Sequence, residues 1–171
     1  MLQGMNDHGQ LGIGNVDMSK ALFFLGEFMK KDFFQENKLK VLDVSFGSRH
    51  TLILTEDRET KRIRVFGSGA SEFGQLCKQT SLVSHEFQDL SNLLPEPIKT
   101  ISAGSYHSLF ITASNKLYGC GKNSKGQLGF KSTTEKFEPK PVEIKVGDPQ
   151  KEEVISAVAG SLYSMALTRV K

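Results

Sequence analysis

Two histidines, His50 and His107, recur at the same place in two similar segments and are the residues best suited to chemistry. Imidazole ligates metals and exchanges protons near neutral pH, so a recurring histidine could belong to a metal site or a catalytic site. A third similar segment has Tyr163 at this position, and tyrosine is a poor metal ligand. We therefore expect these side chains to hydrogen-bond backbone groups between strands and to hold a turn in place.

No other group of residues has the spacing that catalysis or cofactor binding requires. The sequence contains neither a phosphate-binding loop nor a nucleophile elbow, and the segment 67–72 lacks the third glycine of a dinucleotide fingerprint. The aspartates share no motif, and Cys77 and Cys120 are 43 residues apart with no neighbouring metal ligand. We expect two buried free thiols, with a disulfide or a zinc site as the alternatives. We predict no catalytic, cofactor-binding or metal-binding residues and no enzymatic activity.

The composition is that of a soluble globular domain. The chain has 171 residues, of which 38% are hydrophobic and 24% charged, and its formal net charge is +3. These values exclude collagen-like and disordered chains. The charge is too small to indicate nucleic acid, which we do not expect as a partner. The most apolar stretch, 21–25, is far shorter than the roughly 20 residues of a membrane span, so none is expected.

Internal repeats dominate the sequence. The segments 47–55, 104–112 and 160–168 align without gaps at spacings of 57 and 56 residues. A second motif, Gly-Gln-Leu, recurs at 9–11, 74–76 and 126–128. We interpret the recurring residues as structural, and we expect the glycines to adopt positive φ or to allow close approach of strands. The repeated positions are Gly47, His50, Gly104, His107, Gly160, Gly74, Gln75, Gly126 and Gln127.

Each repeat reads as a series of short strands. Leu52 and Leu54 alternate with their neighbours at a period of two, and 114–116 has the composition of a hairpin turn. Short strands with a repeat of 50–60 residues are typical of a β-propeller with one four-stranded blade per repeat. We predict an all-β, incomplete β-propeller of about three blades, each a four-stranded antiparallel sheet. The predicted divisions are a half repeat (1–39), two full repeats (40–96 and 97–150) and a second half repeat (151–171).

The motifs resemble one known family. Ala103–Leu109, Tyr118–Asn123, Gly126–Gly129 and Pro139–Val142 together are similar to the regulator of chromosome condensation repeat, and the resemblance extends over nearly the whole chain. It implies a β-propeller, commonly of seven blades, and for the best-known member it implies nucleotide exchange on the small GTPase Ran. Tyr163 and Cys77 depart from the motif, as expected for diverged repeats.

Three blades are fewer than the four to eight of known propellers, and an open array exposes strand edges and apolar faces. We therefore expect other material to complete or cap the blades: the remainder of a longer product, a second protein, or another copy of this chain. We predict a non-enzymatic interaction or scaffold subunit, with exchange on a Ran-like GTPase as the alternative. The expected location is cytoplasmic, with cytoskeletal and ciliary sites included, and nuclear under the alternative.

Two groups of residues are candidates for binding a partner. The segment 21–34 has apolar residues at helical spacing, and it either packs on its own blade or docks onto another protein. The hairpin 56–64 is the only extended hairpin in the repeats, and its cations are either solvated or face an acidic partner. The candidate residues are Phe23, Phe24, Phe28, Phe33, Phe34, Arg58, Lys61 and Arg62.

Overall fold

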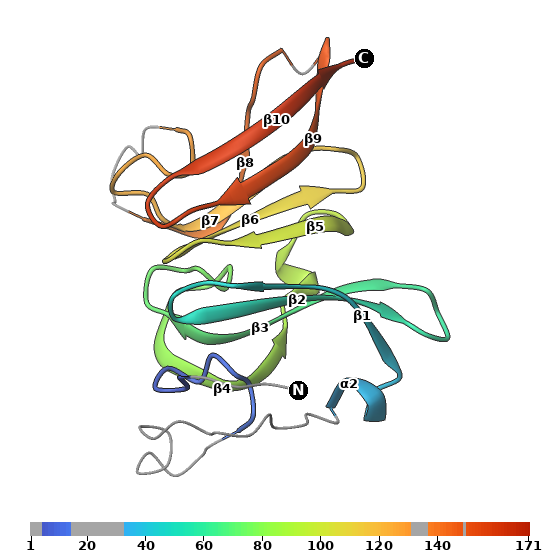
Figure 1. Cartoon of the computed structure of the whole chain (residues 1–171), viewed down its shortest axis with the longest axis vertical. Coiled ribbons are helices and arrows are strands. Elements are labelled where there is room, and N and C mark those ends of the chain that lie inside the picture. The colour runs from blue at the N-terminus through green and yellow to red at the C-terminus, as the bar shows by residue number, and fades with distance from the viewer. Residues whose placement is uncertain (1–4, 15–32, 131–136, 149) are drawn as a thin grey trace.

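The computed structural model of the chain describes residues 5–14, 33–130, 137–148 and 150–171. They form two four-stranded antiparallel sheets and a two-stranded sheet, stacked face to face (Figure 1). Residues 5–14 lie at one end of the stack, and β10 lies at the other end. No helix within these ranges is long and apolar enough to cross a membrane.

The elements follow one another in chain order within each sheet. The first sheet contains β1 (Leu39–Phe46), β2 (His50–Asp57), β3 (Ile63–Ser71) and β4 (Thr80–Asp89). It is preceded by the helix α2 (Phe33–Glu36) and followed by the 3₁₀ turn η1 (Ser91–Leu93). The second sheet contains β5 (Ile98–Ala103), β6 (His107–Thr112), β7 (Leu117–Lys122) and β8 (Phe137–Ile144). The third contains β9 (Glu152–Ala159) and β10 (Ser164–Val170).

The two four-stranded sheets have the same register. His50 is paired with Gly69 across β2 and β3, and His107 is paired with Gly121 across β6 and β7. One repeat of the sequence therefore folds as one four-stranded antiparallel sheet, which confirms the predicted blade.

Apolar side chains fill the spaces between neighbouring sheets. Leu52 and Leu54 of the first sheet pack with Ile98 and Ile101 of the second. At the next contact, Leu109 and Ile111 pack with Val154 and Ala157. Complete burial of one such side chain stabilises the fold by about 1.5–3 kcal/mol, so these contacts hold the sheets in a stack.

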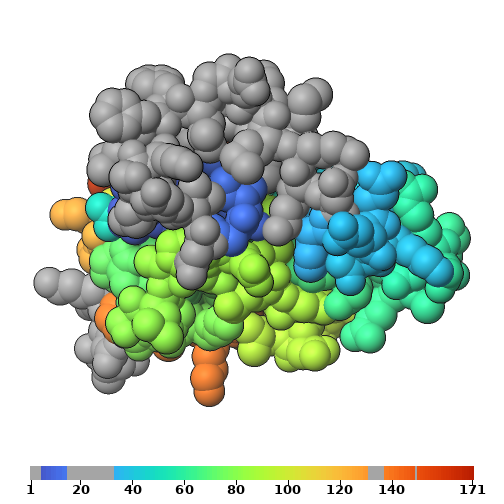
Figure 2. Space-filling view, turned by 90° about the horizontal axis from the view of Figure 1, so that it is seen from below, coloured from blue at the N-terminus to red at the C-terminus, as the bar shows by residue number. Residues whose placement is uncertain are grey.

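Residues 5–14 pack against the free side of the first sheet. The Thr51 hydroxyl donates to the Gln10 carbonyl oxygen at 2.6 Å, and Ile13 forms a β-bridge with Glu86. Figure 2 shows this segment in dark blue at the centre of its face, with the β2–β3 hairpin projecting at one edge. The N-terminal Gly-Gln-Leu motif is therefore placed as a turn on a neighbouring sheet.

Candidate protein-interaction surfaces

The recurring histidines connect successive sheets. His50 Nε2 is 2.9 Å from Ser108 Oγ in the next sheet, and His107 Nε2 is 2.9 Å from Ser164 Oγ in the sheet after that. Both imidazoles are fully buried. The partner is a serine hydroxyl of the following repeat, where the sequence led us to expect a backbone group.

Both buried imidazoles are neutral at physiological pH. Burial lowers the pKa of His50 to about 3, with the nearby His107 contributing, and burial lowers the pKa of His107 to about 4. Neither side chain exchanges a proton near pH 7, where a general base has to work. Among the described residues, no three His, Cys, Asp or Glu side chains are grouped as a metal site would require.

The Gly-Gln-Leu turns form the second connection between sheets. Ser108 Oγ donates to the Gln75 carbonyl oxygen at 2.7 Å, just as Thr51 Oγ1 donates to that of Gln10. The Gln75 side chain also accepts a hydrogen bond from the Phe73 backbone N–H within its own turn. The glutamines therefore fix the shape of the turn, and their carbonyl oxygens bind the next sheet.

Sequence reasoning did not identify the serines of this network. Ser45 Oγ accepts from the Ala103 backbone N–H, and Ser102 Oγ accepts from that of Ala159, both at 2.9 Å. These two serines recur two residues before Gly47 and Gly104. Their recurrence was the available signal, but serine is common enough on strands that it did not stand out.

The two cysteines lie at the contact between the first and second sheets. Cys77 and Cys120 are buried free thiols whose sulfur atoms are 3.2 Å apart. Burial raises the pKa of the Cys77 thiol well above its ordinary value, and Cys120 adds to this rise. A protonated, buried thiol is a poor nucleophile, so the pair serves packing and not catalysis.

The hairpin between β2 and β3 carries the predicted basic residues. Arg58, Lys61 and Arg62 are all exposed at its tip. The Asp57 carboxylate accepts the backbone N–H groups of Glu59 and Thr60, which fixes the turn. Lys61 Nζ is 3.7 Å from Glu56, whereas Arg58 and Arg62 form no ion pair with any described residue.

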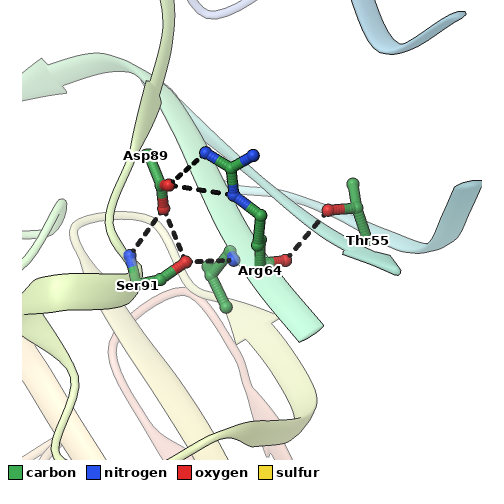
Figure 3. Close-up of polar contacts among 5 residues, drawn as sticks. Thr55, Arg64, Asp89 and Ser91 are labelled. Atoms are coloured by element: carbon green, nitrogen blue, oxygen red, sulfur yellow. Dashed lines mark hydrogen bonds and ion pairs between the residues drawn. The ribbon is translucent and has the colours of Figure 1, made fainter. Parts of the chain in front are cut away.

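A polar cluster holds the base of this hairpin (Figure 3). Arg64 Nε and Nη2 donate to Asp89 Oδ2 at 3.0 and 2.6 Å, and Ser91 donates twice to Asp89 Oδ1. Thr55 Oγ1 adds a bond to the Arg64 carbonyl oxygen. Although burial alone would raise the pKa of Asp89, the bonds from Ser91 and Arg64 hold it below its ordinary value. The cluster ties β2, β3 and β4 together, so the tip projects from a fixed base.

A hollow of about 580 Å³ lies beside the hairpin tip. Its walls include Lys61 and Arg62 from the hairpin, and Leu94, Pro95 and Glu96 from the connection between the first two sheets. It combines cations with apolar and acidic groups, and such a mixed surface is typical of the rim of a protein interface.

The predicted aromatic segment is described only at its end. The Phe33 and Phe34 rings pack edge to face on Phe66 and also contact Phe87, with centroid separations of 5.1–6.4 Å. They cover Ile53 on the free side of the first sheet. Phe23, Phe24 and Phe28 lie outside the described residues. For all five aromatic residues, partner binding remains a prediction.

Apolar side chains are exposed at both ends of the stack. We call Val41, Val44 and Phe46 of β1 the head face, where Phe46 is 62% exposed. We call Met165 and Leu167 of β10 the tail face, where the two side chains are 64% and 59% exposed. Both faces lie at positions that the other repeats bury between sheets.

Comparison with known proteins identifies the repeat. Two family models, both described as the regulator of chromosome condensation (RCC1) repeat, match the chain: one at residues 41–75 and 98–127, the other at residues 114–167. The matches coincide with the sheets and the Gly-Gln-Leu turns. The chain belongs to the RCC1 repeat family.

Similar proteins contain RCC1 repeats within much longer chains. The probable E3 ubiquitin-protein ligase HERC4 of Homo sapiens is 29% identical over 137 residues, which cover 77% of this chain and 12% of HERC4. The ultraviolet-B receptor UVR8 of Arabidopsis thaliana is 28% identical over 151 residues, or 82% of this chain and 29% of UVR8. The chain thus spans less than a third of either relative.

The solved structure of Prp20p from Saccharomyces cerevisiae, reported with its binding to Gsp1p and histones, has the same fold. It superimposes with a TM-score of 0.73 at 19% identity, covering 99% of this chain and 39% of Prp20p. Because RCC1 proteins of this kind are β-propellers and only part of one is matched, the predicted incomplete propeller is confirmed. Together these relatives mark the chain as an RCC1-type interaction module.

Proposed function

We propose that this RCC1-type chain is a non-enzymatic, protein-binding scaffold subunit of a larger assembly. The observation that carries the proposal is the pair of apolar faces at opposite ends of the stack. Contiguous exposed apolar surface on a soluble domain marks an interaction site, and strands with open edges attract further strands. Both features favour a protein as the group that covers these faces.

The buried polar network supports the same function. The histidines, serines and glutamines that recur in the repeats bond to one another between sheets, so they are used in holding the blades together. In propellers of this kind, binding residues are carried by loops and exposed edges on a rigid scaffold.

The β2–β3 hairpin supplies a second, polar contact in this proposal. Arg58 and Arg62 are exposed and have no carboxylate partner among the described residues. A fixed hairpin with two such cations suits an acidic surface on the partner protein. Rim charges of this kind mainly increase the association rate and make it dependent on salt.

The experiment is to measure the native size of the particle that contains the tagged chain after gentle extraction, and to identify co-eluting proteins by mass. The proposal expects a large particle with partners in fixed stoichiometry. The variant Arg58→Glu/Arg62→Glu should reduce recovery of the hairpin's partner, while Lys78→Glu serves as a control at an exposed lysine outside the hairpin. A free species near the 18.9 kDa of one chain would refute the proposal.

A second candidate function, nucleotide exchange on a Ran-like GTPase, is favoured by one observation. The hairpin projects from a braced base, and an exchange factor needs an element of this kind to displace the nucleotide. The yeast structure with the same fold is of a protein studied for its binding to Gsp1p. Release of fluorescent GDP from a Ran-like GTPase tests this function. Acceleration by the chain, lost in Arg58→Glu/Arg62→Glu, would support it, and an unchanged release rate would exclude it.

A further inference from the structure

We propose that the head face of one chain binds the tail face of another, so that a second copy is a partner of this RCC1-type chain. The inference rests on the proposed function, because it names one protein that covers the open faces. It is argued from positions that are equivalent in the three repeats.

The tail face is equivalent to a surface that the chain twice buries between its own sheets. Met165 and Leu167 occupy the positions of Leu52 and Leu54 in the first repeat and of Leu109 and Ile111 in the second. All four counterparts are at most 4% exposed, because the following sheet packs on them. The side chains at the tail remain apolar and of similar size, so this face fits another sheet of the same kind.

The head face is equivalent to the opposite partner in those same contacts. Val41 and Val44 occupy the positions of Ile98 and Ile101, which pack on Leu52 and Leu54. In the third repeat the same two positions are Val154 and Ala157, which pack on Leu109 and Ile111. The two end faces are therefore the two halves of an interface that the chain already makes internally.

A hollow beside the tail face shows that this repeat is incomplete. It has a volume of about 240 Å³, and Leu128, Met165 and Ala166 contribute to its walls. The corresponding place between the first two sheets is filled by Phe110 and Cys120, which are fully buried against Leu76. Among the described strands, β10 pairs only with β9, whereas β2 and β6 each pair on both sides.

Residues 5–14 supply what the last repeat lacks. They pack on the first sheet as the Gly-Gln-Leu turn of a preceding repeat, with the Gln10 carbonyl oxygen accepting from Thr51. The strands β9 and β10 are the first half of a repeat and have no such turn after them in this chain. When the head face of one copy meets the tail face of another, residues 5–14 of the first copy fall in the repeat that β9 and β10 of the second begin.

The polar groups of the internal contacts have counterparts at this interface. Tyr163 stands where His50 and His107 bond to a serine hydroxyl of the following sheet. The residue equivalent to that serine in the second copy is Thr51, whose hydroxyl donates to Gln10 and keeps acceptor capacity for the Tyr163 hydroxyl. Val158 replaces the Ser45 and Ser102 acceptors, so one hydrogen bond of the internal contacts is absent here.

Two copies make a closed ring of six blades. Each chain supplies two complete sheets, and each junction forms one composite blade. Six blades lie within the four to eight of known propellers. A head-to-tail contact is heterologous, and such contacts end in a closed ring when the rotation between subunits allows it.

The first test is the mass of the purified 171-residue chain by light scattering across a dilution series. The proposal expects a species of twice 18.9 kDa that dissociates on dilution. A monomer at every concentration overturns it, and so does a series of ever larger oligomers, since these would show a contact that does not close.

The second test separates head-to-tail pairing from symmetric pairing. Phe46→Asp blocks the head face and Met165→Asp blocks the tail face, and both side chains are exposed in the single chain, so each variant should remain folded by circular dichroism. In a head-to-tail ring, each variant alone is monomeric, and an equimolar mixture regains a dimer through its one intact interface. If one variant still dimerises alone, the pairing is symmetric and the proposal is wrong.

Leu82→Asp is the matched control, because Leu82 is an exposed leucine on β4 that lies in neither face. It should dimerise as the unchanged chain does. If the purified chain is monomeric but the native particle is large, the second copy is excluded while the scaffold function stands. If both species are monomeric, the two proposals fail together.

Discussion

Three glycines allow the effect of space to be separated from that of backbone conformation. A Cβ added at Gly104 would lie 2.3 Å from His107 Cε1 and 2.6 Å from the Gly160 carbonyl oxygen, although Gly104 does not have a positive φ. Gly126 has a φ of +76° but nothing within 4 Å of an added Cβ. Gly121 combines a φ of +102° with a Cβ 2.5 Å from the Tyr106 carbonyl oxygen. Replacing each by alanine therefore tests one effect, the other, or both.

The expected losses of unfolding free energy follow from these environments. Gly126→Ala places alanine in a left-handed conformation, which costs about 1–2 kcal/mol. Gly104→Ala overpacks a site with little room, which costs about 1–3 kcal/mol, and moving His107 away breaks its bond to Ser164 at a cost of about 1 kcal/mol more. Gly121→Ala combines strain and overpacking, for roughly 3–5 kcal/mol.

Urea unfolding followed by circular dichroism measures these losses, and thermal melting gives a second estimate. For a chain of this size, 1 kcal/mol corresponds to roughly 2–4 °C in Tm. The expected order of damage is Gly126, then Gly104, then Gly121. The reasoning is refuted if Gly104→Ala leaves stability unchanged, or if Gly126→Ala is as damaging as Gly121→Ala.

Three further predictions concern buried polar groups. The folded pKa values of His50 and His107 lie below the ordinary 6.5, so the unfolded chain binds more protons, and unfolding free energy should fall as pH drops from 6.5 toward 4, by up to about 1.4 kcal/mol per pH unit for each histidine. His107→Gln should reduce that slope, and an unchanged slope contradicts the assignment. The thiols of Cys77 and Cys120 should react with DTNB only after unfolding, so rapid labelling of the folded chain would show that the sheets separate. Asp89→Asn should speed tryptic cleavage at the β2–β3 hairpin several-fold, and a rate unchanged from wild type would mean that the cluster does not restrain the hairpin.

The repeat pattern was enough to predict the sheets. Alternation around Leu52 and Leu109, together with phased glycines, reports strand periodicity and turn position, both of which are local properties of the chain. The expectation of positive φ was right for Gly121 but wrong for Gly104, which is needed for close approach to the next sheet. Close approach depends on a residue more than fifty positions away, so one repeat read by itself does not reveal it.

The interaction surfaces were less predictable for a similar reason. The sequence identified the hairpin cations, because an extended hairpin is visible in an alignment of the repeats. It could not show that Asp89 and Ser91 brace the hairpin, because these residues lie in a connection that the repeats do not share. The serine partners of His50 and His107 were visible as recurring letters, but their role depends on the stacking of the sheets.

The end faces illustrate what repetition adds to a structural argument. An exposed methionine such as Met165 has little meaning alone, because single apolar residues are common on protein surfaces. Its two equivalents, Leu52 and Leu109, are buried by the following sheet, so the chain itself provides the reference state for this position. The same comparison holds for Val44 against Ile101 and Ala157. Because the two faces are equivalent to opposite sides of one contact, whatever covers the tail must resemble a β1 surface, and β1 of a second chain meets that requirement.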